Sequence, residues 1–505
     1  MAIAVSLALA LSSVWGQGKA PRLGVSADGT RLVDANGKPL VLRGVNWGWW
    51  SCVESGDAEL LHAWGGNLIR ISFMWSKIAG PGSDEPGGEG LALLDAMVGW
   101  AEDAGAWYVL DCQEPPGGCN TAPSCLGGKN ALWREETYQT QCVRMWEMLA
   151  RRYRHCRWLL AYELMNEPTP PTEFTLEQYR ALLLRSIDAI RAVDPERFVV
   201  VSGWGWSDVS GMTDGIVLPR PRLIYTFHCY SPGQVTLEAG TYPGRATLEV
   251  KWLGNSPEAW GATGDTDWTL LRKTFQAPAD VTHGQVMLRS DDNAGTAWFD
   301  EIGLTCEGKS VDLATNSDFR GDCRQRGWKV MRATAGQFAW DGTEGHAAPG
   351  SLRITGTDSY NAWMAEAEFP ARSGVTYTLS CWAKAQAATG LSYPAVAWFR
   401  HHEGAVDRAW LRARIAPALA FSRRNHVPIW CGEFGCSQSN PDGSGVRWVR
   451  DAGDILNSLE IAWTYWNWRE TTGRGSMGVW VQEGGRYAMQ RPLAEVIRQL
   501  LAPGA

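Results

Sequence analysis

The sequence has no surplus of basic residues, because 47 lysines and arginines stand against 54 aspartates and glutamates, for a net charge of −7. A nucleic-acid-binding domain carries a basic patch, so we expect no nucleic-acid partner. Outside residues 2–11, no stretch is long and apolar enough to cross a bilayer, and we expect no membrane span. The 12 cysteines show no spacing typical of a metal site, and we expect neither a metal nor a cofactor.

The first 20 residues contain one apolar run, 2–11, that resembles the core of a signal peptide but lacks a basic segment before it. A signal peptide and a disordered leader both fit this pattern, and we predict a secreted protein. The number of cysteines is compatible with export. Two pairs are disulfide candidates: Cys119 with Cys125, and Cys306 with Cys323.

What the sequence does have is length and tryptophan. Its 505 residues exceed one ordinary hydrophobic core, so two domains are expected. It also contains 29 tryptophans. A tryptophan ring offers a flat apolar face with a polar edge, which suits both core packing and stacking on sugar rings.

Strand-like and helix-like segments alternate along most of the chain. The predicted strands are 41–46, 67–73, 107–112, 159–165, 198–203, 223–230, 427–432 and 461–466. The predicted helices are 57–64, 91–104, 134–153, 175–193, 407–424, 445–459 and 492–501. Eight strands alternating with helices predict an α/β fold, a (β/α)8 TIM barrel over residues 21–255 and 406–505.

The alternation stops between the sixth and seventh strands. Residues 256–405 contain short runs of alternating hydrophobicity separated by turn residues, which predicts an all-β sandwich or jelly roll. This module would be inserted after strand six, in a loop at the C-terminal face of the barrel. That face carries the active sites of TIM-barrel enzymes.

Two of the predicted strands run directly into a carboxylate. Residues 159–165 are mostly apolar and lead into Asn166-Glu167-Pro168, while 429–432 lead into Glu433. A carboxyl group buried at a strand end is costly unless it is paired or its pKa rises, and a raised pKa is what a general acid needs. Asn and Pro also favour ordinary surface turns, so either motif alone is weak evidence for a catalytic carboxyl group. Together, two carboxylates over one barrel mouth suit glycoside hydrolysis, with retention of configuration if they lie about 5 Å apart.

These motifs, with Arg43-Gly44-Val45-Asn46, resemble glycoside hydrolase family 5, the cellulase-like retaining enzymes, over about 40–230 and 408–500. The resemblance implies that Glu167 is the acid/base and Glu433 the nucleophile. It further implies five substrate-binding or supporting residues: Arg70, Asn166, His228, Tyr230 and Trp466. Arg70 would hold Glu433 ionised, Asn166 would bond the sugar 2-hydroxyl, and Tyr230 would touch the nucleophile. The alternatives are a surface salt bridge for Arg70, and core packing for His228 and Trp466.

One position departs from the family pattern. The family commonly has a histidine two residues after the aspartate that ends strand three, whereas this chain has Gln113 after Asp111. Glutamine can hydrogen-bond but cannot titrate, which leaves the two-acid mechanism intact but the sugar specificity open. The neighbouring Glu114 is expected to be a solvent-exposed loop carboxylate, with an additional polar contact as the alternative.

The inserted module resembles carbohydrate-binding modules of families 4 and 9, with its segments in exchanged order. The segment like their usual ending, 298–304, precedes the segment like their usual beginning, 313–319, which suggests a circular permutation. Candidate sugar-stacking residues are Trp328, Trp340, Trp363 and Trp398, each of which could instead belong to the core. The module could also be a spacer that binds nothing.

The predicted function is a monomeric, secreted, retaining β-glycanase acting on a β-linked polysaccharide or oligosaccharide, foremost an endo-β-1,4-glucanase. A β-mannanase, a β-1,3-glucanase or a β-glycosidase with the same machinery is the alternative. A carbohydrate-binding protein with an inactive barrel is the alternative from another class, and the presence of both glutamates argues against it.

Overall fold

The computed structural model describes residues 23–48, 52–79, 86–122, 124–171, 173–238, 240–258, 260–290, 293–313, 317–321, 327–331, 338–356, 362–440, 442–471 and 476–502. The predicted signal peptide and Cys323 lie outside these ranges. Within them, no helix is both long and apolar enough to span a membrane. The chain forms two compact units, residues 1–246 with 405–505, and residues 247–404.

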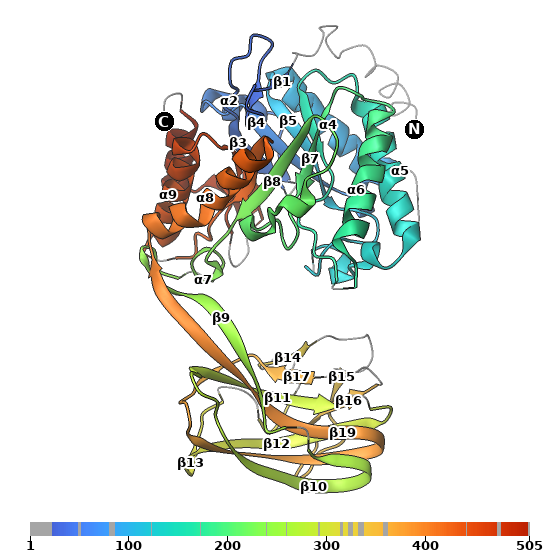
Figure 1. The fold of residues 1–505 in the computed structure, drawn as a ribbon, viewed down its shortest axis with the longest axis vertical. Coiled ribbons are helices and arrows are strands. Elements are labelled where there is room, and N and C mark those ends of the chain that lie inside the picture. Colours follow the sequence, from blue (N-terminus) through green and yellow to red (C-terminus); the bar gives the residue numbers. More distant parts are fainter. Residues whose placement is uncertain are drawn as a thin grey trace. The chain divides into compact units, whose positions relative to one another are not determined.

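The first unit is a closed barrel of eight parallel strands, in the order β20-β21-β3-β4-β5-β6-β7-β8 (Figure 1). The barrel strands are β3 (Arg43–Trp47), β4 (Leu68–Met74), β5 (Trp107–Glu114), β6 (Leu159–Glu163), β7 (Phe198–Ser202), β8 (Leu223–Cys229), β20 (Ile429–Phe434) and β21 (Ala462–Tyr465). The predicted TIM barrel is confirmed, and each predicted strand corresponds to one of these eight.

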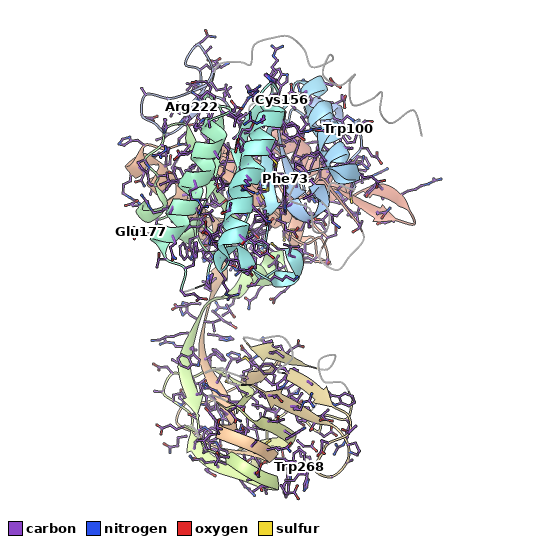
Figure 2. The ribbon with its side chains drawn as sticks, turned by 90° about the vertical axis from the view of Figure 1, so that its right-hand side faces the viewer. Phe73, Trp100, Cys156, Glu177, Arg222 and Trp268 are labelled. Atoms are coloured by element: carbon purple, nitrogen blue, oxygen red, sulfur yellow. The ribbon has the colours of Figure 1, made fainter. Side chains whose placement is uncertain are left out.

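Helices cover the outside of the barrel, and α5 and α6 lie side by side on it (Figure 1). The helices are α2 (Asp57–Ala63), α3 (Trp75–Ile78), α4 (Gly88–Ala104), α5 (Glu136–Tyr153), α6 (Leu176–Arg191), α7 (Gly233–Thr236), α8 (Arg408–Asn425), α9 (Ser444–Ser458) and α10 (Arg491–Leu501). Apolar side chains of the strands pack outward against these helices. Phe73 of β4, labelled in Figure 2, is an example. Its ring meets that of Trp146 of α5 edge-on, with ring centroids 5.7 Å apart.

Local sequence signals fix several helix ends. Thr175 caps α6 as predicted: its hydroxyl accepts from the Gln178 amide, and the Gln178 side chain accepts from the Thr175 amide, which completes a capping box. Helix α4 ends at Gly105, whose φ of 67° is left-handed and costs glycine little.

Small sheets complete the first unit. The strands β1 (Gly24–Val25) and β2 (Leu32–Val33) form an antiparallel pair. The strands β22 (Arg469–Glu470), β23 (Trp480–Glu483) and β24 (Arg486–Met489) form a three-stranded sheet after β21.

The second unit is an antiparallel β structure inserted between β8 and β20, as the sequence predicted. Its strands are β9 (Gly244–Ser256), β10 (Ala262–Gln276), β11 (His283–Ser290), β12 (Thr296–Cys306), β13 (Lys309–Ser310), β14 (Trp328–Met331), β15 (Phe338–Asp341), β16 (Ser351–Thr355), β17 (Ala362–Ala365), β18 (Phe369–Pro370) and β19 (Thr376–Val406). The long strand β19 pairs with β10 and β12 in its first half and with β11 in its second. The strand β19 therefore connects β10, β11 and β12 within one sheet of the inserted unit.

The core of the inserted unit decides between the two roles considered for its tryptophans. Trp328, Trp363 and Trp398 are at most 1% exposed and belong to one apolar cluster, so they cannot stack on a sugar. Trp340 packs partly buried against the same cluster. The sequence left both roles open, with core packing favoured for each ring, because core packing and sugar stacking select the same side chain. The two segments taken as exchanged ends share this core, through Phe299 and Phe319, and the circular permutation stays a prediction.

The predicted disulfide between Cys119 and Cys125 is wrong. Both are free thiols, and the two sulfurs share a hydrogen bond instead of a covalent bond. Both side chains are buried beneath the loop that follows β5. Spacing in a Gly/Pro-rich loop indicated proximity, which the structure shows, but proximity alone does not make a disulfide.

Candidate active site

Arg70 lies at the centre of the barrel interior, on β4, and is fully buried. Its Nε and Nη2 donate to the two carboxylate oxygens of Glu163 at 2.7 and 2.9 Å, and its Nη1 donates to Glu433 Oε1 at 2.7 Å. Nη2 also donates to Asn166 Oδ1 at 2.8 Å and lies 3.0 Å from Asp111 Oδ1. One guanidinium thus fixes side chains from four other strand ends or loops, and a surface salt bridge is excluded.

The register of the strands explains why these carboxylates meet. Asp111 on β5 is paired with Glu163 on β6, and Ser72 on β4 is paired with Asp111. Paired residues of parallel strands lie at one height of the barrel, and their side chains point to the same side of the sheet. Glu163 is therefore a site residue that our sequence analysis missed. The signal was present, because an acid and an arginine both stood inside apolar strands and needed partners.

Glu433 ends the buried strand β20 and is 3% exposed. Besides the bond from Arg70, it accepts a hydrogen bond from the Tyr230 hydroxyl at 2.7 Å on its other oxygen. Burial raises the pKa of Glu433, while His228, Arg70 and the Tyr230 bond oppose that rise and favour the carboxylate. Both oxygens are oriented by donors, as a carboxylate that attacks a fixed carbon requires.

Glu167 lies opposite, in a different environment. Its Oε1 is 2.7 Å from Nδ1 of His228, and in the described residues it has no guanidinium contact. Burial raises its pKa to about 7, an effect that Arg70 opposes and Glu163 reinforces. Burial also lowers the pKa of His228 to about 4, so this imidazole is neutral at pH 7. Glu167 can therefore hold a proton near neutrality and exchange it.

The spacing of the two carboxyl groups matches a double displacement. One oxygen of Glu167, one of Glu433 and a ring nitrogen of His228 all lie within 4.8 Å of one another. Retaining glycosidases place their carboxyl groups about 5 Å apart, whereas inverting enzymes leave room for a water between them. Because Glu167 and Glu433 have different hydrogen-bond partners, the two carboxyl groups can hold different protonation states at one pH.

The groups face a cavity of about 460 Å³ lined entirely by the barrel unit. Trp466, after β21, is half-buried on its wall. Its ring lies against Gly48, where a Cβ would come within 2.2 Å of the indole. Gly48 therefore lets a flat ring reach the reacting subsite, which suits a platform under a sugar.

Gln113 also lines this cavity, in the place of the family histidine. Its Oε1 is buried and has no hydrogen-bond partner among the described residues. Glu114, in contrast, corrects our prediction of an exposed loop carboxylate. It is 3% exposed and accepts the Leu126 amide at 2.8 Å, so it anchors the loop after β5.

Trp206 is a second residue that our sequence analysis missed. It lines the cavity, is 42% exposed, and has a φ of 61°, an uncommon conformation for a non-glycine residue. Its amide bonds to the Pro168 carbonyl, next to Glu167. An exposed indole held beside the acid could carry a sugar outside the reacting subsite. The tripeptide Trp204-Gly205-Trp206 follows β7, the fifth barrel strand in the sequence. Two tryptophans after a strand end were the signal in the sequence that could have indicated a sugar-binding residue.

The role of Glu163 can be tested through the pH dependence of activity. In Glu163→Gln, the loss of a negative neighbour makes Glu167 ionise more easily, so the alkaline limb of kcat/KM moves to lower pH. Removing one partner of a buried ion pair also lowers the free energy of unfolding, by about 3 kcal/mol. Glu460→Gln removes an exposed partner of Arg31 and is the matched control. If the alkaline limb of kcat/KM does not move in Glu163→Gln, Glu163 has only a structural role and does not tune the pKa of Glu167.

Comparison with known proteins agrees with this geometry. A family model described as "Cellulase (glycosyl hydrolase family 5)" matches residues 33–272. These residues are just under half of the chain, and over them the protein is similar to the cellulase-like glycoside hydrolases of family 5. The match includes Arg70, Glu163, Glu167 and His228 but ends before β20, so the place of Glu433 beside them comes from the structure.

The curated relatives of this chain are distant. A "Beta-xylosidase" of Phanerodontia chrysosporium is 26% identical over 223 residues, which cover 35% of this chain and 46% of that protein. An "Endoglucanase" of Paenibacillus polymyxa is 24% identical over 296 residues, 50% of this chain and 69% of the relative. "Endoglucanase C" of Acetivibrio thermocellus is 26% identical over 184 residues, 35% and 50% of the two chains. The chain spans about half the length of several of these relatives.

A solved structure described as a "glycoside hydrolase" aligns with 91% of this chain and 99% of its own at 15% identity, with a TM-score of 0.49. A likeness at that level adds nothing to the topology already described.

Proposed function

We propose that this chain is a retaining β-glycanase, foremost an endo-β-1,4-glucanase, in which Glu433 is the nucleophile and Glu167 the acid/base. The observation that carries the proposal is the convergence of two differently partnered carboxyl groups within 4.8 Å over one cavity. The names of two of the relatives, both endoglucanases, support β-1,4-glucan as the first substrate to test.

The reaction would proceed in two steps. Protonated Glu167 gives its proton to the glycosidic oxygen while Glu433 Oε attacks the anomeric carbon, which breaks the glycosidic bond and forms a glycosyl ester. Glu167, now ionised, takes a proton from water, whose oxygen attacks the same carbon and releases Glu433. Arg70 and Tyr230 hold Glu433 in line for both steps, through their 2.7 Å hydrogen bonds.

The remaining residues would bind the sugar. Asn166 is fixed through its Oδ1 by Arg70, which leaves its amide nitrogen to meet the 2-hydroxyl. Trp466 would carry the reacting sugar, and Trp206 a neighbouring one. The leader 2–11 supports the further proposal that the enzyme is exported to meet a polymer outside the cell.

The experiment that tests the substrate is a product profile of the full chain on cellulose, mixed-linkage glucan, mannan, xylan and laminarin. The proposal expects soluble oligosaccharides of several lengths from β-1,4-linked glucans and slower release from the others. A release of monosaccharide alone would contradict endo action. Faster hydrolysis of mannan, xylan or laminarin than of every β-1,4-glucan would assign another substrate to the same machinery.

A further inference from the structure

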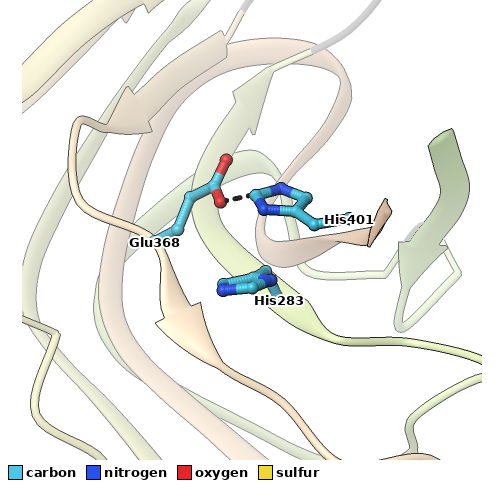
Figure 3. Close-up of side chains that lie close together, drawn as sticks. All are labelled: His283, Glu368 and His401. Atoms are coloured by element: carbon cyan, nitrogen blue, oxygen red, sulfur yellow. Dashed lines mark ion pairs between the residues drawn. The ribbon is translucent and has the colours of Figure 1, made fainter. Parts of the chain in front are cut away.

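The inserted unit contains a cluster of two histidines and a glutamate on one face of three adjacent strands (Figure 3). In the antiparallel ladder, His283 of β11 is opposite Phe399 of β19 on one side and opposite Pro370 of β18 on the other. Residues two apart along a strand share a face, so His401 and Glu368 flank His283 on the same side. Each of the three strands, or the residue next to it, supplies one side chain.

The distances within the cluster are those of side chains that converge on one point. One possible ligand atom from each of His283, Glu368 and His401 lies within 4.8 Å of the other two. His401 Nε2 is 3.1 Å from Glu368 Oε2, yet this buried nitrogen makes no hydrogen bond within the described residues. Two ligands about 2.1 Å from a tetrahedral ion lie about 3.4 Å apart, close to this separation.

The surroundings of His283 select its ligand atom. Its Nδ1 is 2.9 Å from the hydroxyl of Thr282, which leaves Nε2 facing the cluster. Thr282 is itself fixed, because its hydroxyl accepts the His401 amide at 2.8 Å. A second partner that takes the other ring N–H is the usual support of a metal-binding histidine.

An ordinary ion pair explains this arrangement less well. The rings of His283 and His401 stack with centroids 4.0 Å apart and planes at 20°, which disfavours two imidazolium charges. Neutral imidazoles offer lone pairs, and they are the form that binds metal.

We propose that His283, His401 and Glu368 bind one divalent transition-metal ion, with Zn²⁺ as the ion that fits best. Two imidazole nitrogens and one carboxylate oxygen suit Zn²⁺, whereas Ca²⁺ and Mg²⁺ require oxygen ligands. An imidazole lone pair lies in the ring plane, so the half-buried His283 ring turns out of the stack when the ion binds. A water takes the fourth position.

The bound ion would fasten three strands to one another, including β19, the strand that leads back to the barrel at Val406. Such a site stabilises the inserted unit and does not depend on the hydrolase assignment. The other cluster of this kind within the described residues, Glu167, His228 and Glu433, differs in its partners. There Glu433 already accepts bonds from Arg70 and Tyr230, and a guanidinium next to the site repels a second cation.

The test is a Zn²⁺ titration of the tag-free full chain, freed of metal with EDTA, by calorimetry or with a competing chromophoric chelator. The parent is expected to bind one Zn²⁺ per chain and to melt at a higher temperature with Zn²⁺ than with EDTA. His283→Gln and His401→Gln are each expected to weaken binding at least about 100-fold and to lose the thermal shift. Ca²⁺ is expected to give neither response.

Two controls distinguish this cluster from the neighbouring His402 and from the barrel cluster as the place where Zn²⁺ binds. His402→Gln changes the exposed neighbour on the same strand and should bind like the parent. His228→Gln removes the imidazole of the barrel cluster and should also bind like the parent. Equal melting temperatures of all variants in EDTA would show that they fold. The proposal is overturned if the parent binds no Zn²⁺, if binding survives in both His283→Gln and His401→Gln, or if only His228→Gln abolishes it.

Discussion

Replacement of Glu433 by glutamine is expected to lower kcat on a β-1,4-glucan by about 10⁴-fold or more, because no other described carboxylate is aligned to attack the anomeric carbon. Glutamine has the same shape: its one carbonyl oxygen can accept from Arg70, and its NH2 group can donate to the Tyr230 hydroxyl. The variant should therefore fold, although it loses one charge of a buried ion pair. Initial rates and the burst of an aryl leaving group in parent and variant give the measurement.

The matched control is Glu495→Gln, an exposed carboxylate on α10 that should have the parent's activity. Activity of Glu433→Gln within tenfold of the parent, with an equal melting temperature, would remove Glu433 from the mechanism. Loss of activity with loss of folding would be resolved by Glu433→Asp, which keeps the charge but withdraws it by one methylene.

Replacement of Glu167 by alanine should give a loss that depends on the leaving group. General acid catalysis contributes roughly 10²- to 10⁴-fold, and a leaving group that needs no proton escapes this loss. With an activated aryl β-glycoside the first step should stay fast, and the glycosyl ester should accumulate because no base activates water. Azide needs no base, so added azide should restore turnover and give a β-glycosyl azide.

The pH dependence follows from the same group. The pKa of Glu167 is raised to about 7, so the fraction in the acid form, and with it kcat/KM, falls as the pH rises through 7. At low pH, kcat/KM falls again when Glu433 is protonated, and burial moves that limb above the ordinary glutamate range. In Glu167→Ala with the aryl substrate, the alkaline limb should vanish. An unchanged limb, or no response to azide, would contradict the acid/base assignment.

The barrel could be predicted because each of its strands and helices is marked by residues close together in the sequence. Each strand is a buried apolar run bounded by helix signals, and TIM-barrel strands end at one rim, so Glu167 and Glu433 could be brought together without coordinates. Thr175 marked the start of its helix by its capping chemistry. The insertion could be placed because helix periodicity stops at one point and returns at another.

What could not be predicted depends on partners far apart in the chain. In the sequence, Glu163 is a single acid in an apolar strand. Only the pairing register of the barrel strands shows that it lies beside Arg70 and Asp111. The buried Trp328, Trp363 and Trp398 could not be separated from sugar-stacking rings, because exposure is a property of the packed unit. Likewise, His283, Glu368 and His401 share no motif and meet only through the ladder of three strands.

The most direct test of the central claim is the anomeric configuration of the first product, followed by proton NMR while a cello-oligosaccharide is cleaved. One oxygen of Glu167 and one of Glu433 lie within 4.8 Å, which matches the separation of about 5 Å in retaining enzymes, so the β-anomer is predicted to appear first and the α-anomer only later by mutarotation. Initial formation of the α-anomer would show a single displacement, which would contradict Glu433 as the nucleophile.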